Sequence, residues 1–293
     1  MPPPVTTLEE RTAMKPNRNV PKITLVAAAT LGLFASMLAA LPAQAADDRS
    51  DLIATSAVET AEAALGLTDD TEKDTPLVLN AGDELDLRGS DTAVSVVMGA
   101  ANEPDEPETR YTSDQLDGTT TRVAAVLASP KNANPSWTFD EGTELYVLPD
   151  GRVSVADADG NLLAGIAAPW AIDAGGQRVE TTYTAEGNVL TQHVEVNEST
   201  TFPVVADPTF TVFPGYWTAT LNRSESAAAV GTVGSCAAVF SKSPVPALRA
   251  LTVACGALAA FSTAQLAGGK CVKVHVAGLP PVVATWWPTF PKC

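Results

Sequence analysis

The chain has 293 residues, with 18 basic and 34 acidic side chains and a formal net charge of −16. Such an acidic chain argues against a nucleic-acid partner, which a protein meets with a basic surface. If residues 1–45 are removed as a signal peptide, 248 residues remain, enough for one large domain or two small ones.

The first 45 residues have the three parts of a signal peptide. Basic residues precede an uncharged apolar run, Ile23–Leu41, and the run is followed by Ala43-Gln44-Ala45, whose small side chains suit signal peptidase. We expect cleavage between Ala45 and Ala46, which makes Ala43, Ala45 and Ala46 the cleavage-site residues. The protein is then secreted and extracellular.

Two alternatives remain open at this end of the chain. Glu9 and Glu10 oppose a cationic leader, whereas Met14 opens the basic stretch Met-Lys-Pro-Asn-Arg, so translation from Met14 instead of Met1 is a second hypothesis. An uncleaved anchor is the other, because the run of about 19 residues approaches the ~20 that span a bilayer. No Cys follows the apolar run, which argues against a lipoprotein.

Charge and cysteine divide the remaining chain at the same border. Residues 46–208 carry 31 acidic and 8 basic side chains, a net charge of −23, whereas residues 209–293 carry one acidic and six basic side chains, a net charge of +5. All four cysteines lie in the basic part. The expected organisation is a signal peptide (1–45), a short helix with an acidic linker (46–76), an acidic antiparallel β domain (77–208) and a cationic four-cysteine domain (209–293).

The four cysteines, Cys236, Cys255, Cys271 and Cys293, are an even number in an exported chain, which favours two disulfides. Three pairings are possible, and we favour Cys236–Cys255 with Cys271–Cys293 because both are local. Zinc is the competing interpretation, but the sequence has no C-x-x-C and only one His nearby. We expect no metal site, no cofactor and no catalytic residue.

The acidic part begins with a helix and continues in strands. Asp51–Leu65 has helical spacing, with Asp51 as a cap and Gly66 as a stop. The acidic segment 102–108 predicts an exposed loop. Strand-like runs are Leu77–Asn80, Ala93–Met98, Thr121–Leu127, Glu144–Leu148, Arg152–Ala156, Leu162–Ala168, Val179–Thr184 and Val189–Val196. The last five are separated by Gly-containing pairs that suit tight hairpins, so we expect a β-meander.

Two features of this meander invite a functional interpretation. Asp157-Ala-Asp159-Gly160-Asn161 resembles part of a calcium loop, but it lacks the later bidentate Glu and the expected Gly position. A plain hairpin turn is the preferred interpretation. His193 lies in strand alternation, which favours a surface or cross-strand residue over a catalyst.

The basic part predicts a helical hairpin. Asn222 and Glu225 form an approximate capping box for a helix through Phe240, and Ser243-Pro244 starts a second helix that runs to Ala267. The uncharged stretch Ala250–Gly269 leaves three alternatives: a soluble packed hairpin, a conditional membrane binder, or a membrane span.

After the hairpin, Val272–Val276 alternates as a strand. Trp286, Trp287 and Phe290 then either cap a small core or sit at a membrane interface. The expected fold class is α+β, with an antiparallel β-meander domain followed by a small disulfide-stapled α-helical hairpin and a short β tail.

The heptapeptide Phe202-Pro-Val-Val-Ala-Asp-Pro208 resembles one found in many uncharacterised secreted proteins of high-GC Gram-positive (actinobacterial) bacteria. The similarity includes Asp157–Gly160, Ala168-Pro169-Trp170 and the four-cysteine region with Gly269-Lys270-Cys271, and covers roughly residues 145–293. Many of those proteins have Tyr where Phe202 stands. The resemblance implies secretion and such a source, and it implies no activity.

Three functions follow as hypotheses. In the first, the acidic β domain restrains a cationic, membrane-active C-terminal module that is released by processing near Val205–Phe213, because opposite charges attract. In the second, an uncleaved protein binds the cell envelope or supports it structurally. In the third, a secreted hydrolase uses a pair of carboxylates. The expected partners are an anionic membrane surface or the cell wall, together with contact between the acidic and basic parts.

Overall fold

The computed structural model describes residues 43–67, 76–88, 93–99, 109–212, 217–242, 249, 251–261, 263–277 and 285–293, all within one compact unit. Residues 1–42 of the expected signal peptide, most of the acidic linker and the acidic segment 102–108 lie outside the described residues.

The first helix, α1, spans Ala43–Leu65 and ends at Gly66, whose φ of 69° is left-handed. The end predicted from the sequence is confirmed. The start lies before the expected cap at Asp51, because the segment Ala43–Ala46 contains three alanines, the best helix-forming residue, and prolongs the helix toward the N-terminus.

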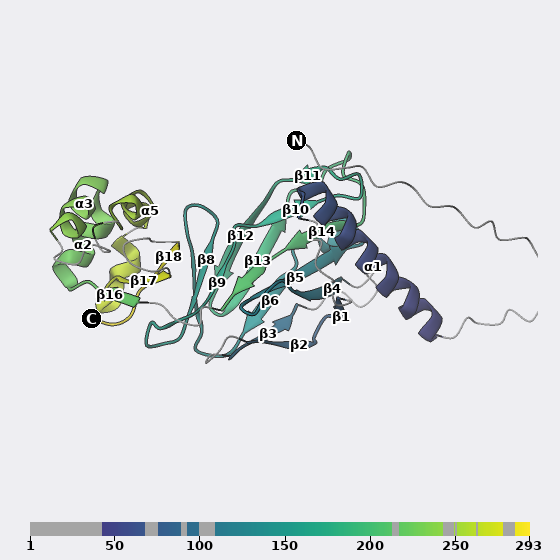
Figure 1. The fold of residues 1–293 in the computed structure, drawn as a ribbon, viewed down its shortest axis with the longest axis horizontal. Helices are drawn as coiled ribbons and strands as arrows, with labels where there is room; N and C mark the ends of the chain where they lie inside the picture. The colour runs from purple at the N-terminus through teal and green to yellow at the C-terminus, as the bar shows by residue number, and fades with distance from the viewer. Residues whose placement is uncertain are drawn as a thin grey trace, which may run out of the picture. The chain divides into compact units, whose positions relative to one another are not determined.

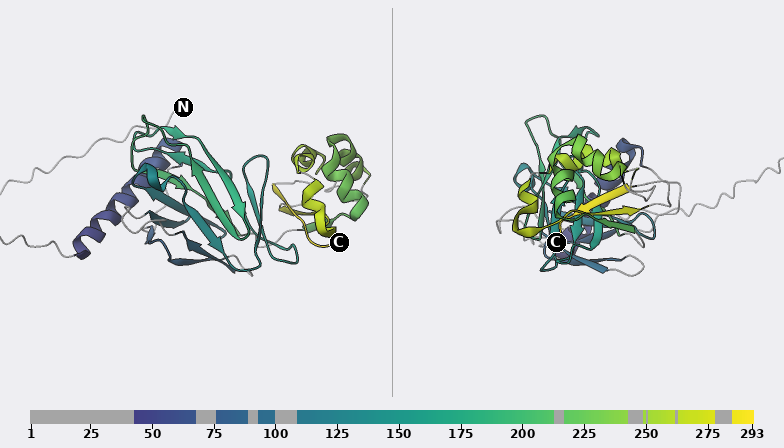
Figure 2. Two further views of the ribbon diagram at one scale, coloured as in Figure 1. Left: turned by 180° about the vertical axis from the view of Figure 1, so that it is seen from behind. Right: turned by 90° about the vertical axis from the view of Figure 1, so that its left-hand side faces the viewer.

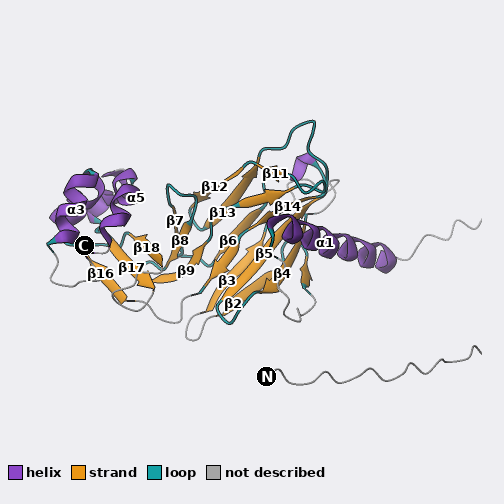
Figure 3. Cartoon of the chain, turned by 45° about the horizontal axis from the view of Figure 1, so that its top comes forward, coloured by secondary structure: helices purple, strands orange, loops and turns teal. Residues whose placement is uncertain are grey.

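Two antiparallel sheets lie face to face behind α1 and are called the sandwich below (Figures 1 and 3). Sheet A contains β1 (Leu77–Leu79), β4 (Arg110–Gln115), β5 (Thr120–Leu127), β7 (Glu144–Val147), β8 (Val153–Ala156), β9 (Leu162–Ile166), β10 (Trp170–Ile172), β11 (Arg178–Val179), β14 (Val204–Asp207) and β15 (Thr209–Thr211). Sheet B contains β2 (Glu84–Arg88), β3 (Ala93–Met98), β6 (Ser136–Phe139), β12 (Thr181–Glu186) and β13 (Val189–Val194).

The core of the sandwich is made by the inward side chains of both sheets. Tyr111 of sheet A meets Trp137 of sheet B edge to face, with 6.0 Å between ring centroids. Phe139 and Phe210 form a tilted pair across the layers, with 6.1 Å between ring centroids. Such aromatic pairs add to the burial of apolar area, so this layer is where the sandwich is held together.

The strand order of sheet A is β11-β10-β14-β5-β15-β9-β8-β7, with β4 on the other edge of β5. Strands β14 and β15 therefore lie one after the other along the same edge of β5, between it and β9–β10. Pro208 separates them, and its carbonyl still accepts from the N–H of Val123 at 3.0 Å. The heptapeptide that ends at Pro208 thus contributes a central strand of the sheet.

The eight strand-like runs of the sequence all contain strands, and β7, β8 and β9 pair as the expected meander. Their turns hold Gly151 and Gly160 with φ of 85° and 71°, as tight hairpins require. The run Val179–Thr184 is divided between β11, the end of one hairpin, and β12, which belongs to the other sheet.

The cysteine-containing region, residues 217–293, has a sheet of its own, sheet C. It consists of β16 (Trp217–Thr220), β17 (Lys273–Ala277) and β18 (Thr285–Thr289), with β17 in the middle. Helices α2 (Arg223–Gly231), α3 (Val233–Ser241) and α5 (Cys255–Ala260) gather beside it, which the two views of Figure 2 show in green and yellow. The fold class is therefore mixed, with antiparallel sheets followed by late helices and a β tail, as expected.

The long helices of the predicted hairpin are interrupted. Thr232, at φ −146° and ψ 157°, ends α2 and caps α3 through Ser235, so the helix predicted through Phe240 is two helices. The capping box at Asn222 and Glu225 is confirmed. Residues 243–248, 250 and 262 lie outside the described residues. The described remainder of the predicted second helix contains α5 between two 3-10 segments, with an extended Phe261.

Within the described ranges, none of the helices combines the length and hydropathy that a bilayer crossing requires.

Candidate functional site

The edge of sheet A formed by β7, β8 and β9 meets the cysteine-containing region, and this contact is called the junction. One buried cluster contains Tyr146, Leu148 and Ala156 of the sandwich together with Phe290 and Phe261. The Phe290 ring lies 4.9 Å from that of Tyr146 and 5.2 Å from that of Phe261. The sandwich therefore completes the core of the cysteine-containing region.

A tryptophan is seated directly on the backbone of β9. If Gly165 carried a Cβ, that atom would lie 2.6 Å from Cε2 and 2.7 Å from Cη2 of Trp287. The guanidinium of Arg152, on the turn into β8, lies 4.7 Å from the centroid of the same ring, and Arg152 Nη1 donates to the carbonyl oxygen of Trp286 at 3.2 Å. Only glycine at position 165 permits this approach.

An ion pair lies beside these aromatic contacts. Lys270 Nζ lies 2.9 and 3.1 Å from the two carboxylate oxygens of Glu144, which also accepts from the Tyr146 hydroxyl. Burial raises the pKa of Tyr146, and Glu144 raises it further, so the phenol stays a neutral donor. Because the Lys270 and Glu144 side chains are about one third exposed, the pair is worth about 0–1 kcal/mol. The apolar contacts dominate the junction.

A buried histidine connects sheet C to the sandwich. His275 Nε2 lies 2.8 Å from Thr289 Oγ1, which donates to the carbonyl oxygen of Gly160 at 2.8 Å. Gly160 itself lies under Pro291, since a Cβ there would be 2.6 Å from the proline Cβ. The turn between β8 and β9 is thus held by a hydrogen-bond chain and by a close backbone contact.

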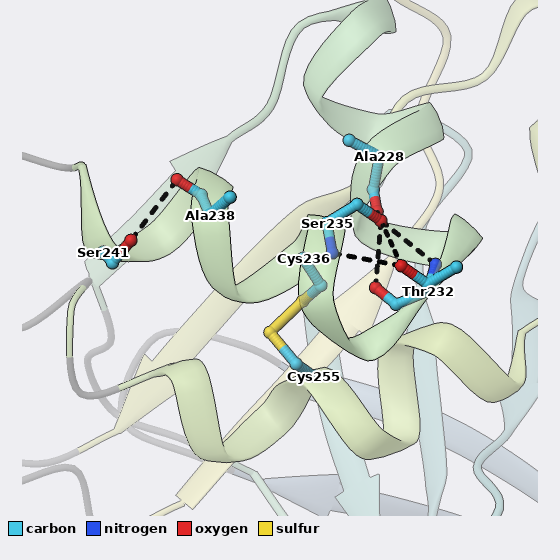
Figure 4. Close-up of a disulfide and its surroundings, with 7 residues drawn as sticks. All are labelled: Ala228, Thr232, Ser235, Cys236, Ala238, Ser241 and Cys255. Atoms are coloured by element: carbon cyan, nitrogen blue, oxygen red, sulfur yellow. Dashed lines mark hydrogen bonds between the residues drawn. A yellow bond between two sulfur atoms is a disulfide. The ribbon is translucent and has the colours of Figure 1, made fainter.

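Two disulfides hold the cysteine-containing region, and the pairing favoured from the sequence is confirmed. Cys236 on α3 is bonded to Cys255 on α5, with 5.5 Å between Cα atoms, beside the Thr232–Ser235 cap (Figure 4). Cys271 is bonded to Cys293 with 5.0 Å between Cα atoms. The second bond links the residue before Val272, at the entry to β17, to the end of the chain.

A second polar cluster lies between α1 and sheet A. Arg122 forms an ion pair with Glu62 of α1, and Arg122 Nε lies 3.6 Å from Oδ1 of Asp207. All three side chains are buried. Burial raises the pKa of Asp207 to about 6, against the lowering by Arg122 and by the Thr209 hydroxyl, which donates to Asp207 at 2.7 Å. Because these carboxylates share one arginine beneath a helix, they are poorly placed to act on a saccharide.

Small apolar side chains complete the contact between α1 and the sheet, namely Ala54, Val58 and Ala61 of the helix against Ala124, Val126, Ile172 and Val205. Farther toward its N-terminus, α1 borders a groove of about 360 Å³ lined by Leu52, Ile53 and Pro203, with Arg49 at its rim. Leu52 and Ile53 are 72% and 50% exposed. The lining of this groove is mainly apolar, and nothing in the described residues identifies an occupant.

The residues singled out from the sequence lie apart from both clusters or take structural roles. Asp157 Oδ1 accepts from the N–H groups of Asp159 and Asn161, and Lys273 donates to the Asn161 side chain at 2.9 Å, which fits a hairpin turn. His193 contacts Thr184 across β12 and β13, as a cross-strand residue does. In the part of the chain that the structure describes, no three His, Cys, Asp or Glu side chains gather as metal ligands.

Ala43, Ala45 and Ala46, the expected cleavage-site residues, lie in the first turn of α1. The residues that sequence reasoning missed are Gly165, Arg152 and the trio Glu62, Arg122 and Asp207. Their partners come from distant parts of the chain, and a single glycine in a strand is the sole local signal, since it marks a close backbone approach. Comparisons with models of known families, with curated proteins and with solved structures find no match to this chain.

Proposed function

We propose that the chain is a secreted, non-enzymatic protein that binds the cell envelope uncleaved, with its acidic and basic parts acting as one body. The junction carries the proposal, because the cluster around Phe290 contains side chains from both parts and Trp287 is seated on Gly165. Separation would expose both faces to water. The two disulfides support export, since such bonds persist in oxidising compartments.

The heptapeptide strand supports the same function. Release of the basic part would require a cut near Val205–Phe213, but the described residues of that range are buried or half-buried between β5 and β9–β10. A protease needs an accessible backbone, which is typical of exposed loop tips. The resemblance of the heptapeptide to those of actinobacterial secreted proteins supports secretion of this chain and assigns no activity.

The intact mass of the protein from culture supernatant, before and after reduction, tests this function. One species from Ala46 to Cys293 that gains four hydrogens on reduction is expected, since two disulfides open. The same species should sediment with purified cell wall and be released by salt or denaturant, because the sequence has no LPxTG sorting motif for covalent attachment. A separate basic fragment in the supernatant would overturn the proposal.

A precursor is the second candidate, favoured by the burial of the paired tryptophans. Trp286 and Trp287 are 9% and 5% exposed, and Lys270 is paired with Glu144, so groups that suit an anionic membrane interface are held against the acidic part. In this function the uncut chain leaves anionic vesicles intact and the naturally released fragment permeabilises them. A released fragment without lipid affinity contradicts it.

A further inference from the structure

His275 is one of two histidines in the chain and is fully buried on β17, the middle strand of sheet C. The Thr289 hydroxyl donates to the Gly160 carbonyl oxygen, so Thr289 Oγ1 accepts from His275 Nε2–H. The imidazole therefore carries a proton on Nε2, and acid adds the second proton at Nδ1. Its hydrogen-bond chain ends on the β8–β9 turn of the sandwich, not within sheet C.

The surroundings of His275 disfavour a positive charge. Its paired strands, β16 and β18, have no charged residue, and the charged groups that face it are Lys273 on its own strand and Asp157 in the β8–β9 turn. Burial, and then Lys273, lower the pKa of His275 to about 4, against a smaller rise from Gly160 and Asp157. A histidine in water has a pKa of about 6.5.

We propose that the junction is an acid-sensitive contact: protonation of His275 at Nδ1 places a positive charge in the buried contact and favours release of sheet C from the β8–β9 turn. A protonated ring needs water, because burial of a charge is costly. The two disulfides hold the cysteine-containing region together, so separation from the sandwich is the route by which water reaches the ring. Opening would expose Trp287 and the slot at Gly165. This device is independent of the envelope-binding function.

The size of the effect follows from the two pKa values. Protonation is disfavoured in the closed state, so the closed state loses stability as pH falls through the ordinary value of about 6.5 toward 4. The equilibrium constant for opening should rise about 20-fold between pH 7 and pH 5 and roughly 100-fold by pH 4.

Hydrogen exchange of the full mature chain, corrected for the intrinsic pH dependence of exchange, tests the proposal. Between pH 7 and pH 5, protection of residues 157–166, 273–277 and 285–291 should fall about 20-fold, while residues 120–127 in sheet A stay protected. In His275→Gln, which keeps an N–H donor and does not titrate, this fall should be absent. His193→Gln is the matched control, and it should behave like the parent chain.

Two results would overturn the proposal: an unchanged pH response in His275→Gln, or equal loss of protection in residues 120–127 and at the junction. If His275→Gln does not fold, the parent chain still decides the question through NMR titration of the imidazole C–H signals. A folded-state pKa of His275 near 6.5 contradicts the proposal, and a value near 4 with loss of junction contacts below it supports it.

Discussion

The contact between Gly165 and Trp287 can be tested by adding one methyl group. In Gly165→Ala the new Cβ would lie within 2.6 and 2.7 Å of two ring carbons of Trp287, closer than carbon atoms approach without repulsion. The ring is 5% exposed and is held by Arg152, so it must shift or leave its slot. Overpacking of this kind costs about 1–3 kcal/mol.

The stability loss in Gly165→Ala should depend on the presence of the Trp287 ring. Trp287→Ala should lower the free energy of unfolding by about 3–5 kcal/mol, because it removes a large buried side chain. In the double variant the methyl group enters the vacated space and costs little. The cycle should therefore show a coupling free energy of about 1–3 kcal/mol, as residues in contact do.

Urea unfolding followed by far-UV circular dichroism, with the disulfides intact, measures the free energy of unfolding of the parent chain, the two single variants and the double variant. Gly118→Ala is the matched control, because a Cβ there meets nothing within 4 Å, and it should change stability by less than about 0.5 kcal/mol. If Gly165→Ala behaves like Gly118→Ala, or if the two junction losses simply add, the reasoning that Trp287 docks on β9 is refuted.

Two further variants test the buried carboxyl group of Asp207 and the Cys271–Cys293 disulfide. Since the pKa of Asp207 is raised to about 6 in the folded chain, its contribution to stability is full below about 3.8 and is lost as pH rises through 6. Between pH 3.5 and pH 7 the stability of Asp207→Asn relative to the parent chain should therefore rise by about 3 kcal/mol, read from urea midpoints at both pH values; equal differences at the two pH values would contradict this. Replacing Cys271 and Cys293 together by serine opens a loop with a sequence separation of 22 and should cost about 3 kcal/mol in thermal unfolding, and a loss under about 0.5 kcal/mol would contradict it.

Local chemistry explains which parts of the fold could be predicted. The hairpins between β7, β8 and β9 are specified by neighbouring residues, since Gly151 and Gly160 tolerate left-handed φ and the strands alternate. The partners of β5 are not specified locally, because β14 pairs with it from a distant part of the sequence. Alternation identifies a strand and the face it buries, whereas it leaves the neighbouring strand undetermined.

The same limit applies to the candidate site. Charge totals predict attraction between the acidic and basic parts, yet the contacts at the junction are mainly apolar, and Trp287 meets a glycine. The helix break at Thr232 was also missed, because its side chain caps α3 in an extended conformation that a helical pattern does not reveal. The disulfide pairing was predictable because both bonds are local.

The central place of Val204–Thr211 in sheet A also constrains the order in which the chain can fold. If the chain is exported as proposed, β5 and β9 each keep one unpaired edge on the far side of the membrane until residues beyond 200 have crossed. Unpaired edges invite association with other chains, and the net charge of −23 on residues 46–208 keeps such intermediates apart. Closure of the sheet by the two late strands β14 and β15 is a long-range step, so in a secreted chain we expect export to be completed before the sandwich forms.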